Sequence, residues 1–265
     1  MDRTEIEVVK VGEFEVPVRL AQLTGCPPAT FESYGNAQFR TFQQHLDIKA
    51  NDSVLEIGCG VGRLAIPCAA VLKPGGSYLG IDIIKDSIDW CSANISRAYP
   101  NFRFHFENVV SPLHNPAGLI DPAVTKIPLP ASSVDKIFLS SVFTHMFTDG
   151  VEHYLREFRR VLKPNGIILS TMFLLNEESE EAIKLGKTNW TFPHRLQNDE
   201  FCRVESLDSV EGAVAYKESD YLALIRRNGM DLLKPIIYGA WSGPHRPADG
   251  QDYVVFGHQR VVPLN

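Results

Sequence analysis

The sequence predicts an α/β protein with a doubly wound, mostly parallel β-sheet. Three observations favour this class. Short apolar segments of strand length alternate with amphipathic segments of helical period between residues 53 and 175. Three glycines follow the first of these strands, at the point where a helix is expected. The last strand, residues 167–175, is apolar throughout, as a central strand covered on both faces should be.

Two elements precede the alternating region. Residues 5–20 alternate apolar and polar side chains on either side of a glycine, which predicts a short hairpin outside the main fold. Residues 31–48 carry Phe39, Phe42 and Leu46 at helical spacing and predict a helix. We therefore expect an N-terminal extension over residues 1–30 and a single domain over residues 31–265.

Strands and helices then follow in regular order. The predicted strands are residues 53–57, 77–82, 102–106, 134–141 and 167–175. The predicted helices between them are residues 63–72, 85–100 and 150–166. The second helix turns Ile88, Cys91 and Ile95 inward, and the third ends at the Pro-Asn-Gly of residues 164–166. Residues 108–132 carry five prolines and no period, which predicts a long functional or mobile loop.

The last hundred residues have a different pattern. A helix is predicted over residues 176–186 and another over 216–229, with an irregular insertion between them. Residues 231–241 and 251–262 predict two strands with no helix between them, hence an antiparallel hairpin at the sheet edge. We treat residues 176–216 as one insertion after the fifth strand.

Composition excludes several classes of protein. The formal net charge of −6 is a poor match for a protein that must neutralise nucleic-acid phosphates. The five cysteines are odd in number and form no CxxC, so neither a disulfide framework nor a metal site is predicted. No apolar run approaches 18 residues, which argues against a membrane span. Free thiols and the lack of an apolar leader at the start of the sequence favour a soluble cytoplasmic protein.

The glycines after the first strand indicate a nucleotide site. Gly58, Gly60 and Gly62 have the spacing GxGxG, which lets a ligand approach a helix N-terminus closely. Arg63 stands after them, so the third glycine of the dinucleotide fingerprint GxGxxG is absent, and no GK[ST] follows. A NAD-dependent oxidoreductase and a P-loop protein are both disfavoured.

Two carboxylates narrow the choice of nucleotide. Glu56, two residues before the first glycine, would repel a pyrophosphate but suits an amine or a sulfonium. Asp82 ends the second strand, twenty residues after Gly62, where an acid can accept both ribose hydroxyls. S-adenosylmethionine (SAM) has the ribose and the positive charge that these residues require.

Four stretches in this order resemble the class I SAM-dependent methyltransferases: VLEIGCGVGRL (54–64), GIDI (80–83), SSVDKIFLSSVFTHM (132–146) and YLREFRRVLKPNGIILSTMF (154–173). The similarity covers about residues 30–175. It implies seven strands in the order 3-2-1-4-5-7-6, with the seventh antiparallel, and methyl transfer from SAM, which leaves S-adenosylhomocysteine (SAH).

The resemblance also implies which residues contact the cofactor. The glycines line its methionine part, Asp82 holds the ribose and Ile83 packs on the adenine. Asn108 takes the place of an acid that binds the adenine amino group in many relatives, and Glu107 is the alternative. Arg63 contacts the SAM carboxylate or faces solvent. The full cofactor set is Glu56, Gly58, Cys59, Gly60, Gly62, Arg63, Asp82, Ile83, Asn108 and Ser140.

One histidine is the candidate catalytic residue. His145 follows the fourth strand, where relatives place groups near the transferred methyl, and an imidazole can take a hydroxyl proton at neutral pH. A loop-ordering role is the alternative. His194 and His245 could line an acceptor pocket, whereas His153 falls within a helix and is read as a surface residue.

Aromatic residues at the start of the first helix allow a further contact. Phe31 and Tyr34 could meet the sulfonium by a cation–π interaction or pack on the sheet.

We expect a metal-independent enzyme that methylates a small-molecule acceptor, and a hydroxyl oxygen of a sugar, glycoconjugate or secondary metabolite is the favoured target. The Pro-Pro-Tyr type of motif found in base- and amide-methylating enzymes is absent after the fourth strand. Residues 176–216 should contribute to the acceptor pocket. A SAM-binding regulatory or scaffolding protein without catalysis is the alternative, and the sequence indicates no oligomeric state.

Overall fold

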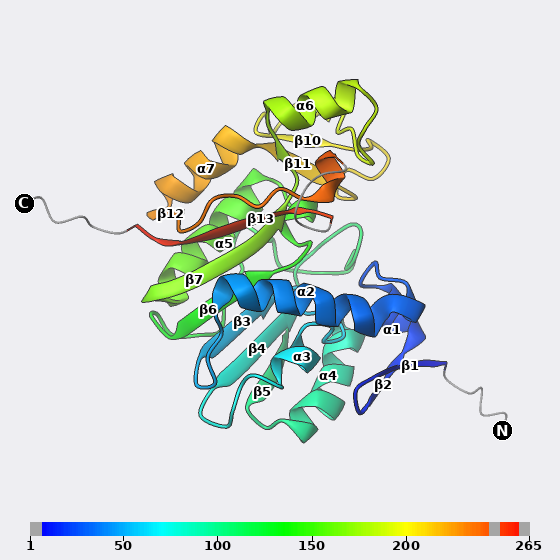
Figure 1. Cartoon of the computed structure of the whole chain (residues 1–265), viewed down its shortest axis with the longest axis vertical. Helices are drawn as coiled ribbons and strands as arrows, with labels where there is room; N and C mark the ends of the chain where they lie inside the picture. Colours follow the sequence, from blue (N-terminus) through cyan, green and yellow to red (C-terminus); the bar gives the residue numbers. More distant parts are fainter. Residues whose placement is uncertain (1–6, 244–249, 260–265) are drawn as a thin grey trace, which may run out of the picture. The chain divides into compact units, whose positions relative to one another are not determined.

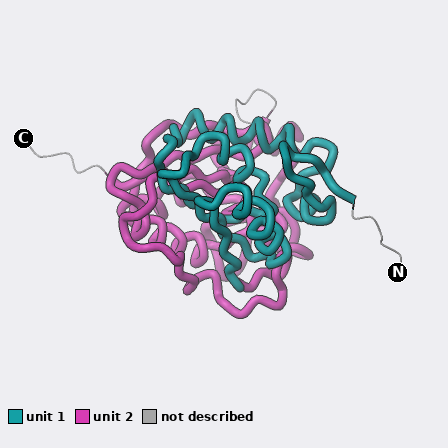
Figure 2. Tube along the Cα trace, turned by 90° about the horizontal axis from the view of Figure 1, so that it is seen from below, with its two compact units in different colours: residues 1–108 teal, residues 109–265 magenta. Residues whose placement is uncertain are grey.

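The computed structural model describes residues 7–243 and 250–259, and Figure 1 shows their helices and strands. The chain divides into two compact units, residues 1–108 (unit 1) and residues 109–265 (unit 2), which Figure 2 colours separately. The domain boundary expected at residue 30 stays a prediction. No helix among the described residues is both long and apolar enough to cross a membrane.

Unit 1 contains three parallel strands with the predicted bounds. They are β3 (Ser53–Ile57), β4 (Ser77–Asp82) and β5 (Phe102–Phe106). Their order is β5-β4-β3, and Ile57 lies opposite Ile81 at the carboxyl end of the first pair. This order is the 3-2-1 half of the predicted sheet, and it brings the ends of β3 and β4 side by side.

The long helices of unit 1 also match the predictions. They are α2 (Phe31–Leu46) and α4 (Lys85–Ala98). The three residues expected to face inward on α4, namely Ile88, Cys91 and Ile95, are all buried. The apolar period therefore sets which face of α4 packs on the strands.

The helix predicted over residues 63–72 is wrong in its length. Only α3 (Ala65–Cys68) is regular α-helix, with turns on both sides. Pro67 explains the difference, because it has no amide hydrogen to donate to the carbonyl of Arg63.

The N-terminal hairpin is confirmed over the described residues. It consists of β1 (Val8–Val11) and β2 (Phe14–Pro17), which pair antiparallel. Two short helices follow, α1 (Val18–Gln22) and the 3-10 helix η1 (Pro28–Thr30). Phe14 is buried, and its ring centroid lies 6.3 Å from that of Trp90 on α4, so the hairpin packs on the helices of unit 1.

Unit 2 contains a sheet of four longer strands. They are β6 (Val134–Leu139), β7 (Leu162–Met172), β12 (Met230–Leu232) and β13 (Asp252–His258). Their order is β6-β7-β13-β12, which is the predicted 4-5-7-6 half. β7 runs parallel to β6, whereas β13 is antiparallel to both of its neighbours, as predicted for the seventh strand.

The helix predicted over residues 150–166 ends earlier than expected. Helix α5 spans Thr148–Val161, and β7 begins at the next residue. Leu162 has an extended ψ of 133° and pairs with Val134 on β6. The residue before Pro164 is disfavoured in a helix, so the chain enters the strand ahead of the Pro-Asn-Gly turn. Helix α7 (Glu218–Arg227) packs against α5 through an ion pair of 2.8 Å between Arg227 and Glu152.

The insertion is more regular than expected. Its predicted helix is confirmed as α6 (Glu177–Lys184). Its remaining residues are not wholly irregular, because three short strands among them join β8, just before the insertion, in a second sheet of the order β8-β11-β10-β9. These strands are β8 (Leu174–Leu175), β9 (His194–Arg195), β10 (Cys202–Val204) and β11 (Val214–Lys217). Strands of two to four residues are too short to show a period in the sequence.

Two predicted segments are shorter or less regular in the structure. The strand expected over residues 231–241 is limited to β12, followed by an isolated bridge from Ile237 to Tyr253 and the 3-10 helix η3 (Ala240–Ser242). The loop over residues 108–132 contains no helix or regular strand, as predicted.

Candidate functional site

The glycine turn after β3 requires glycine at three positions. Gly58, Gly60 and Gly62 have φ angles of +72°, +51° and +82°, in the left-handed region that other residues rarely adopt. The amides of Gly58 and Cys59 donate to the carbonyl of Ile81 at 2.8 and 3.1 Å. These bonds fold the turn onto the end of β4.

The third glycine also permits close packing of α4. A Cβ at Gly62 would lie 2.5 Å from Cδ1 of Ile95 and 3.4 Å from Sγ of Cys91. Two thiols, those of Cys59 and Cys91, lie 3.7 and 3.6 Å from the carbonyl oxygen of Gly60 and donate to it. Burial raises the pKa of both thiols well above the ordinary value, so they are protonated groups that order the turn.

Asp82 closes the turn from the end of β4. Its Oδ2 accepts the amide hydrogen of Gly60 at 2.6 Å, and its Oδ1 accepts that of Ile84 at 2.8 Å. Burial raises the pKa of this carboxyl, and the amide hydrogen bonds oppose that shift. A carboxylate oxygen has two lone pairs, so each oxygen can accept one more hydrogen bond, which is what a ribose diol needs.

Glu56 is buried beneath the turn. Only 1% of its surface is exposed, and it accepts a hydrogen bond from the hydroxyl of Tyr78. Burial raises its pKa to about 8, although Tyr78 and Arg63 favour the charged form. The carboxyl is therefore largely neutral near pH 7 in the protein alone. A bound cation would favour its ionised form.

Residues of helix α2 contact Arg63, the arginine that follows the glycines. The Cζ of Arg63 lies 5.1 Å from the ring centroid of Tyr34, and its Nη2 donates to Gln38 at 3.3 Å. Gly35 allows this approach, since a Cβ there would lie 2.9 Å from the carbonyl oxygen of Arg63. The face of Tyr34 thus meets a protein cation, and Phe31 is fully buried in the core.

The two candidates for the adenine end both lie just after β5. Glu107 is 8% exposed, lies 3.3 Å from Nε2 of His105, and donates its amide hydrogen to the carbonyl of Asp82 at 3.0 Å. Asn108 and Ile83 are both partly exposed. The choice between Asn108 and Glu107 stays open.

Unit 2 carries the other predicted residues. Ser140 is 8% exposed and follows β6 directly. His145 ends the 3-10 helix η2 (Phe143–His145), and its Nδ1 lies 2.7 Å from the backbone carbonyl oxygen of Glu211. A carbonyl oxygen can only accept, so Nδ1 carries the hydrogen, and in the neutral imidazole Nε2 is then the accepting nitrogen. His145 therefore has the tautomer that a general base needs.

A second imidazole lies beside His145. The ring centroids of His114 and His145 are 5.5 Å apart, with the rings nearly perpendicular. Burial and the neighbouring His145 lower the pKa of His114. No sequence motif predicts His114 or Glu211 as site residues. The one signal for His114 was its position in the long proline-rich loop.

The remaining histidines differ in environment. His153 on α5 is not simply a surface residue, because its Nε2 donates to the carbonyl of Thr125 in the proline-rich loop. His194 is partly exposed on β9, and His245 lies outside the described residues. Within residues 7–243 and 250–259, no three His, Cys, Asp or Glu side chains are grouped so as to hold a metal ion. Metal independence stays a prediction.

Comparison with known proteins finds a matching family and a related protein. A family described as a methyltransferase domain matches residues 55–170, which include the glycine turn, Asp82 and His145. The methyltransferase GfsG of Streptomyces halstedii is 22% identical over 227 residues, which cover 83% of this chain and 69% of that protein.

Solved structures share the fold. The cyclase SpnF has a TM-score of 0.51 and 17% identity, covering 75% of this chain and 59% of its own. The mitomycin 7-O-methyltransferase MmcR has a TM-score of 0.55 and 15% identity, covering 90% of this chain and 60% of its own. This chain thus spans about three fifths of the length of both. At such identities the likeness establishes a common fold and no more.

Proposed function

Because this chain belongs to the class I SAM-dependent methyltransferases through residues 55–170, we propose that it methylates a hydroxyl oxygen of a small molecule. The acceptor class is a sugar, a glycoconjugate or a secondary metabolite. The acceptor is the part of the proposal that goes beyond the family.

The observation that carries the proposal is the glycine turn closed on Asp82. Three left-handed glycines expose backbone at the end of β3, and Asp82 fixes that backbone through the amide of Gly60. The two carboxyl groups fit SAM, because Asp82 can still accept hydrogen bonds from ribose hydroxyls and Glu56 can balance a cationic group. Bound SAM would supply an electrophilic methyl carbon on a sulfonium.

The chain's own residues would then do three things. Gly58, Gly60 and Gly62 hold the methionine part of the cofactor, while Asp82 orients the ribose. Nε2 of His145 takes the proton that the acceptor hydroxyl loses, and Nδ1 keeps its hydrogen bond to Glu211. Because the sulfide is a good leaving group, methyl transfer mainly requires that the acceptor hydroxyl is aligned with the methyl carbon and that one proton is removed.

One observation supports an oxygen acceptor. With Nδ1 of His145 donating to the carbonyl of Glu211, Nε2 of the neutral imidazole is the accepting nitrogen, as deprotonation of a hydroxyl needs. MmcR shares the fold and is by its name an O-methyltransferase, and GfsG is by its name a methyltransferase. Both names describe those proteins, so the choice of oxygen rests on His145.

A transfer assay tests the proposal. The protein is incubated with SAM and a panel of sugars, glycosides and polyketide alcohols, with matched amines in parallel, and SAH formation is measured. We expect SAH to form with hydroxylated acceptors. Formation with amines alone would contradict the oxygen assignment.

Replacement of His145 tests its role as base. We expect His145→Ala to lower methyl transfer by about 10²-fold or more, as loss of a general base does. Its affinity for SAH should be unchanged. Undiminished transfer by the variant would exclude His145 as the base.

A SAM-binding protein without methyl transfer is the second candidate. The observation in its favour is the fold shared with SpnF, which is by its name a cyclase. A fold does not determine a reaction. Binding of SAH with no transfer to any acceptor in the panel would favour this candidate.

A further inference from the structure

Glu211 joins two segments of unit 2 that are far apart in sequence. Its backbone carbonyl oxygen accepts from Nδ1 of His145 at 2.7 Å. Its carboxylate accepts from the hydroxyl of Ser111 at 2.8 Å, across 100 residues of sequence. The position of this carbonyl is therefore set both by the insertion, to which Glu211 belongs, and by the proline-rich loop.

The loop side of this contact is an ordered turn. Ser111 and Asn115 exchange two backbone hydrogen bonds of 3.1 and 2.9 Å, and Nδ2 of Asn115 donates to the carbonyl of Val109 at 2.9 Å. The hydroxyl of Ser111 also accepts the amide hydrogen of His114 at 3.3 Å. The turn thus presents Ser111 to Glu211 and the ring of His114 to that of His145.

The insertion also fixes the residues that follow His145. The hydroxyl of Tyr216 donates to the carbonyl of Met146 at 3.0 Å. Asp199 accepts both the amide and the hydroxyl hydrogen of Thr148, each at 2.8 Å. Glu211, Tyr216 and Asp199 of the insertion therefore contact the four-residue segment 145–148. Of these three, Glu211 is the one that contacts the imidazole of His145.

We propose that Glu211, braced by Ser111, is a positioning residue that fixes His145 as its Nδ1–H tautomer and leaves Nε2 to accept a proton. This rests on the proposed function in so far as the proton is that of a hydroxyl acceptor. A neutral imidazole has one donating and one accepting nitrogen, so a fixed acceptor at Nδ1 decides which nitrogen can act as base. Burial and the neighbouring His145 lower the pKa of His114, which favours the neutral form of that ring.

The tautomer can be measured without cofactor or acceptor. The protein is labelled with ¹⁵N-histidine, and long-range ¹H–¹⁵N NMR spectra are recorded at about pH 8, where an ordinary imidazole is neutral. The His145 signals are identified by their loss in His145→Ala. We expect a protonated Nδ1 and an unprotonated Nε2.

Variants distinguish the effect of the Ser111–Glu211 hydrogen bond from a general loosening of the insertion. Ser111→Ala and Glu211→Ala should convert His145 to a mixture of both tautomers, because the carbonyl loses its fixed position. Glu211→Gln should keep the Nδ1–H form, since an amide oxygen can still accept from Ser111. Asp199→Ala is the control, because it removes an insertion contact at Thr148 and should lower the Tm without changing the tautomer.

An Nε2–H tautomer in the parent, or an unchanged tautomer in both Ser111→Ala and Glu211→Ala, would overturn the inference. A change in Asp199→Ala equal to that in Glu211→Ala would also overturn it, because loosening alone would then explain the effect. The proposed function fails separately. A protein with the expected tautomer that transfers no methyl group contradicts the function alone, whereas one that transfers it with the wrong tautomer contradicts the inference alone.

Discussion

At the scale of single residues, Glu56 couples stability to pH. Its pKa of about 8 in the folded protein lies above the unfolded value of 4.5, because burial disfavours the charged form. The stabilisation of the protonated form is thus fully present below about pH 4.5 and is lost as the pH rises through about 8. One pKa unit is worth about 1.4 kcal/mol, so the effect should reach a few kcal/mol.

Glu56→Gln tests this directly, because the amide cannot ionise. Urea unfolding of the parent and the variant is compared between pH 5 and pH 9. The free energy of unfolding of the parent, relative to that of the variant, should fall with rising pH. Parallel curves over the whole range would contradict a buried, proton-binding Glu56.

Gly62 combines a backbone requirement with a packing requirement. Its φ of +82° disfavours any side chain, and a Cβ would lie 2.5 Å from Ile95. Gly186 is a matched control, because its φ is +63° with nothing within 4 Å of a Cβ. A left-handed residue costs about 1–2 kcal/mol, so both alanine variants should lose about that much. Gly62→Ala should lose more and also bind SAH more weakly, and equal losses of stability would contradict the packing role.

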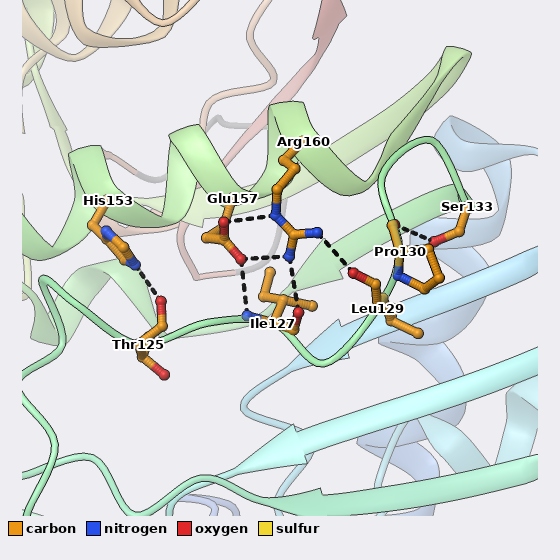
Figure 3. Close-up of polar contacts among 8 residues, drawn as sticks. All are labelled: Thr125, Ile127, Leu129, Pro130, Ser133, His153, Glu157 and Arg160. Atoms are coloured by element: carbon orange, nitrogen blue, oxygen red, sulfur yellow. Dashed lines mark hydrogen bonds and ion pairs between the residues drawn. The ribbon is translucent and has the colours of Figure 1, made fainter.

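At the scale of elements, α5 anchors the end of the proline-rich loop (Figure 3). Arg160 donates through Nη1 to the carbonyl of Leu129 at 2.7 Å and through Nη2 to that of Ile127 at 2.9 Å. Glu157 pairs with Arg160 at 2.6 Å and accepts the amide hydrogen of Ile127 at 2.9 Å. The planar guanidinium can make these bonds together, which a lysine cannot.

Arg160→Lys should therefore free the loop without unfolding α5. Hydrogen exchange of the amides at residues 127–133 should become faster in the variant. Arg156→Lys is the control, since the side chain of Arg156 is 55% exposed and pairs with Glu152 at 3.8 Å. Unchanged exchange in Arg160→Lys would show that other contacts hold the loop.

The long elements were predictable from sequence, and the short ones were not. Strands β3, β4 and β5 have the predicted bounds, because each is a short segment of regularly placed apolar residues that begins directly after a turn. Pro67 limits the length of α3. Leu162 belongs to β7 rather than to α5, because it pairs with Val134 on β6. The second sheet escaped prediction because its strands gain their stability from packing with each other rather than from a local pattern.

At the scale of the whole molecule, the candidate site divides into a predictable and an unpredictable part. The glycine turn and Asp82 lie in local motifs and could be read from sequence. The roles of Glu211 and Ser111 could not be read from sequence. Glu211 lies 66 residues from His145 and 100 residues from Ser111 in the chain, and these contacts form only when the protein folds. The first part lies within residues 1–108 and His145 within residues 109–265, and SAH binding and the tautomer of His145 can be measured independently.

The most direct test of the account is calorimetric titration with SAH of the parent and of Asp82→Ala. We predict binding in the micromolar range for the parent and at least about tenfold weaker binding for the variant, since a hydrogen bond to a charged group is worth about 1.5–3 kcal/mol. Asp86→Ala, which removes an exposed carboxylate paired with Arg19, should bind as the parent does. Absence of SAH binding by the parent, or equal affinity of parent and Asp82→Ala, would contradict the assignment of the glycine turn and Asp82 as a SAM site.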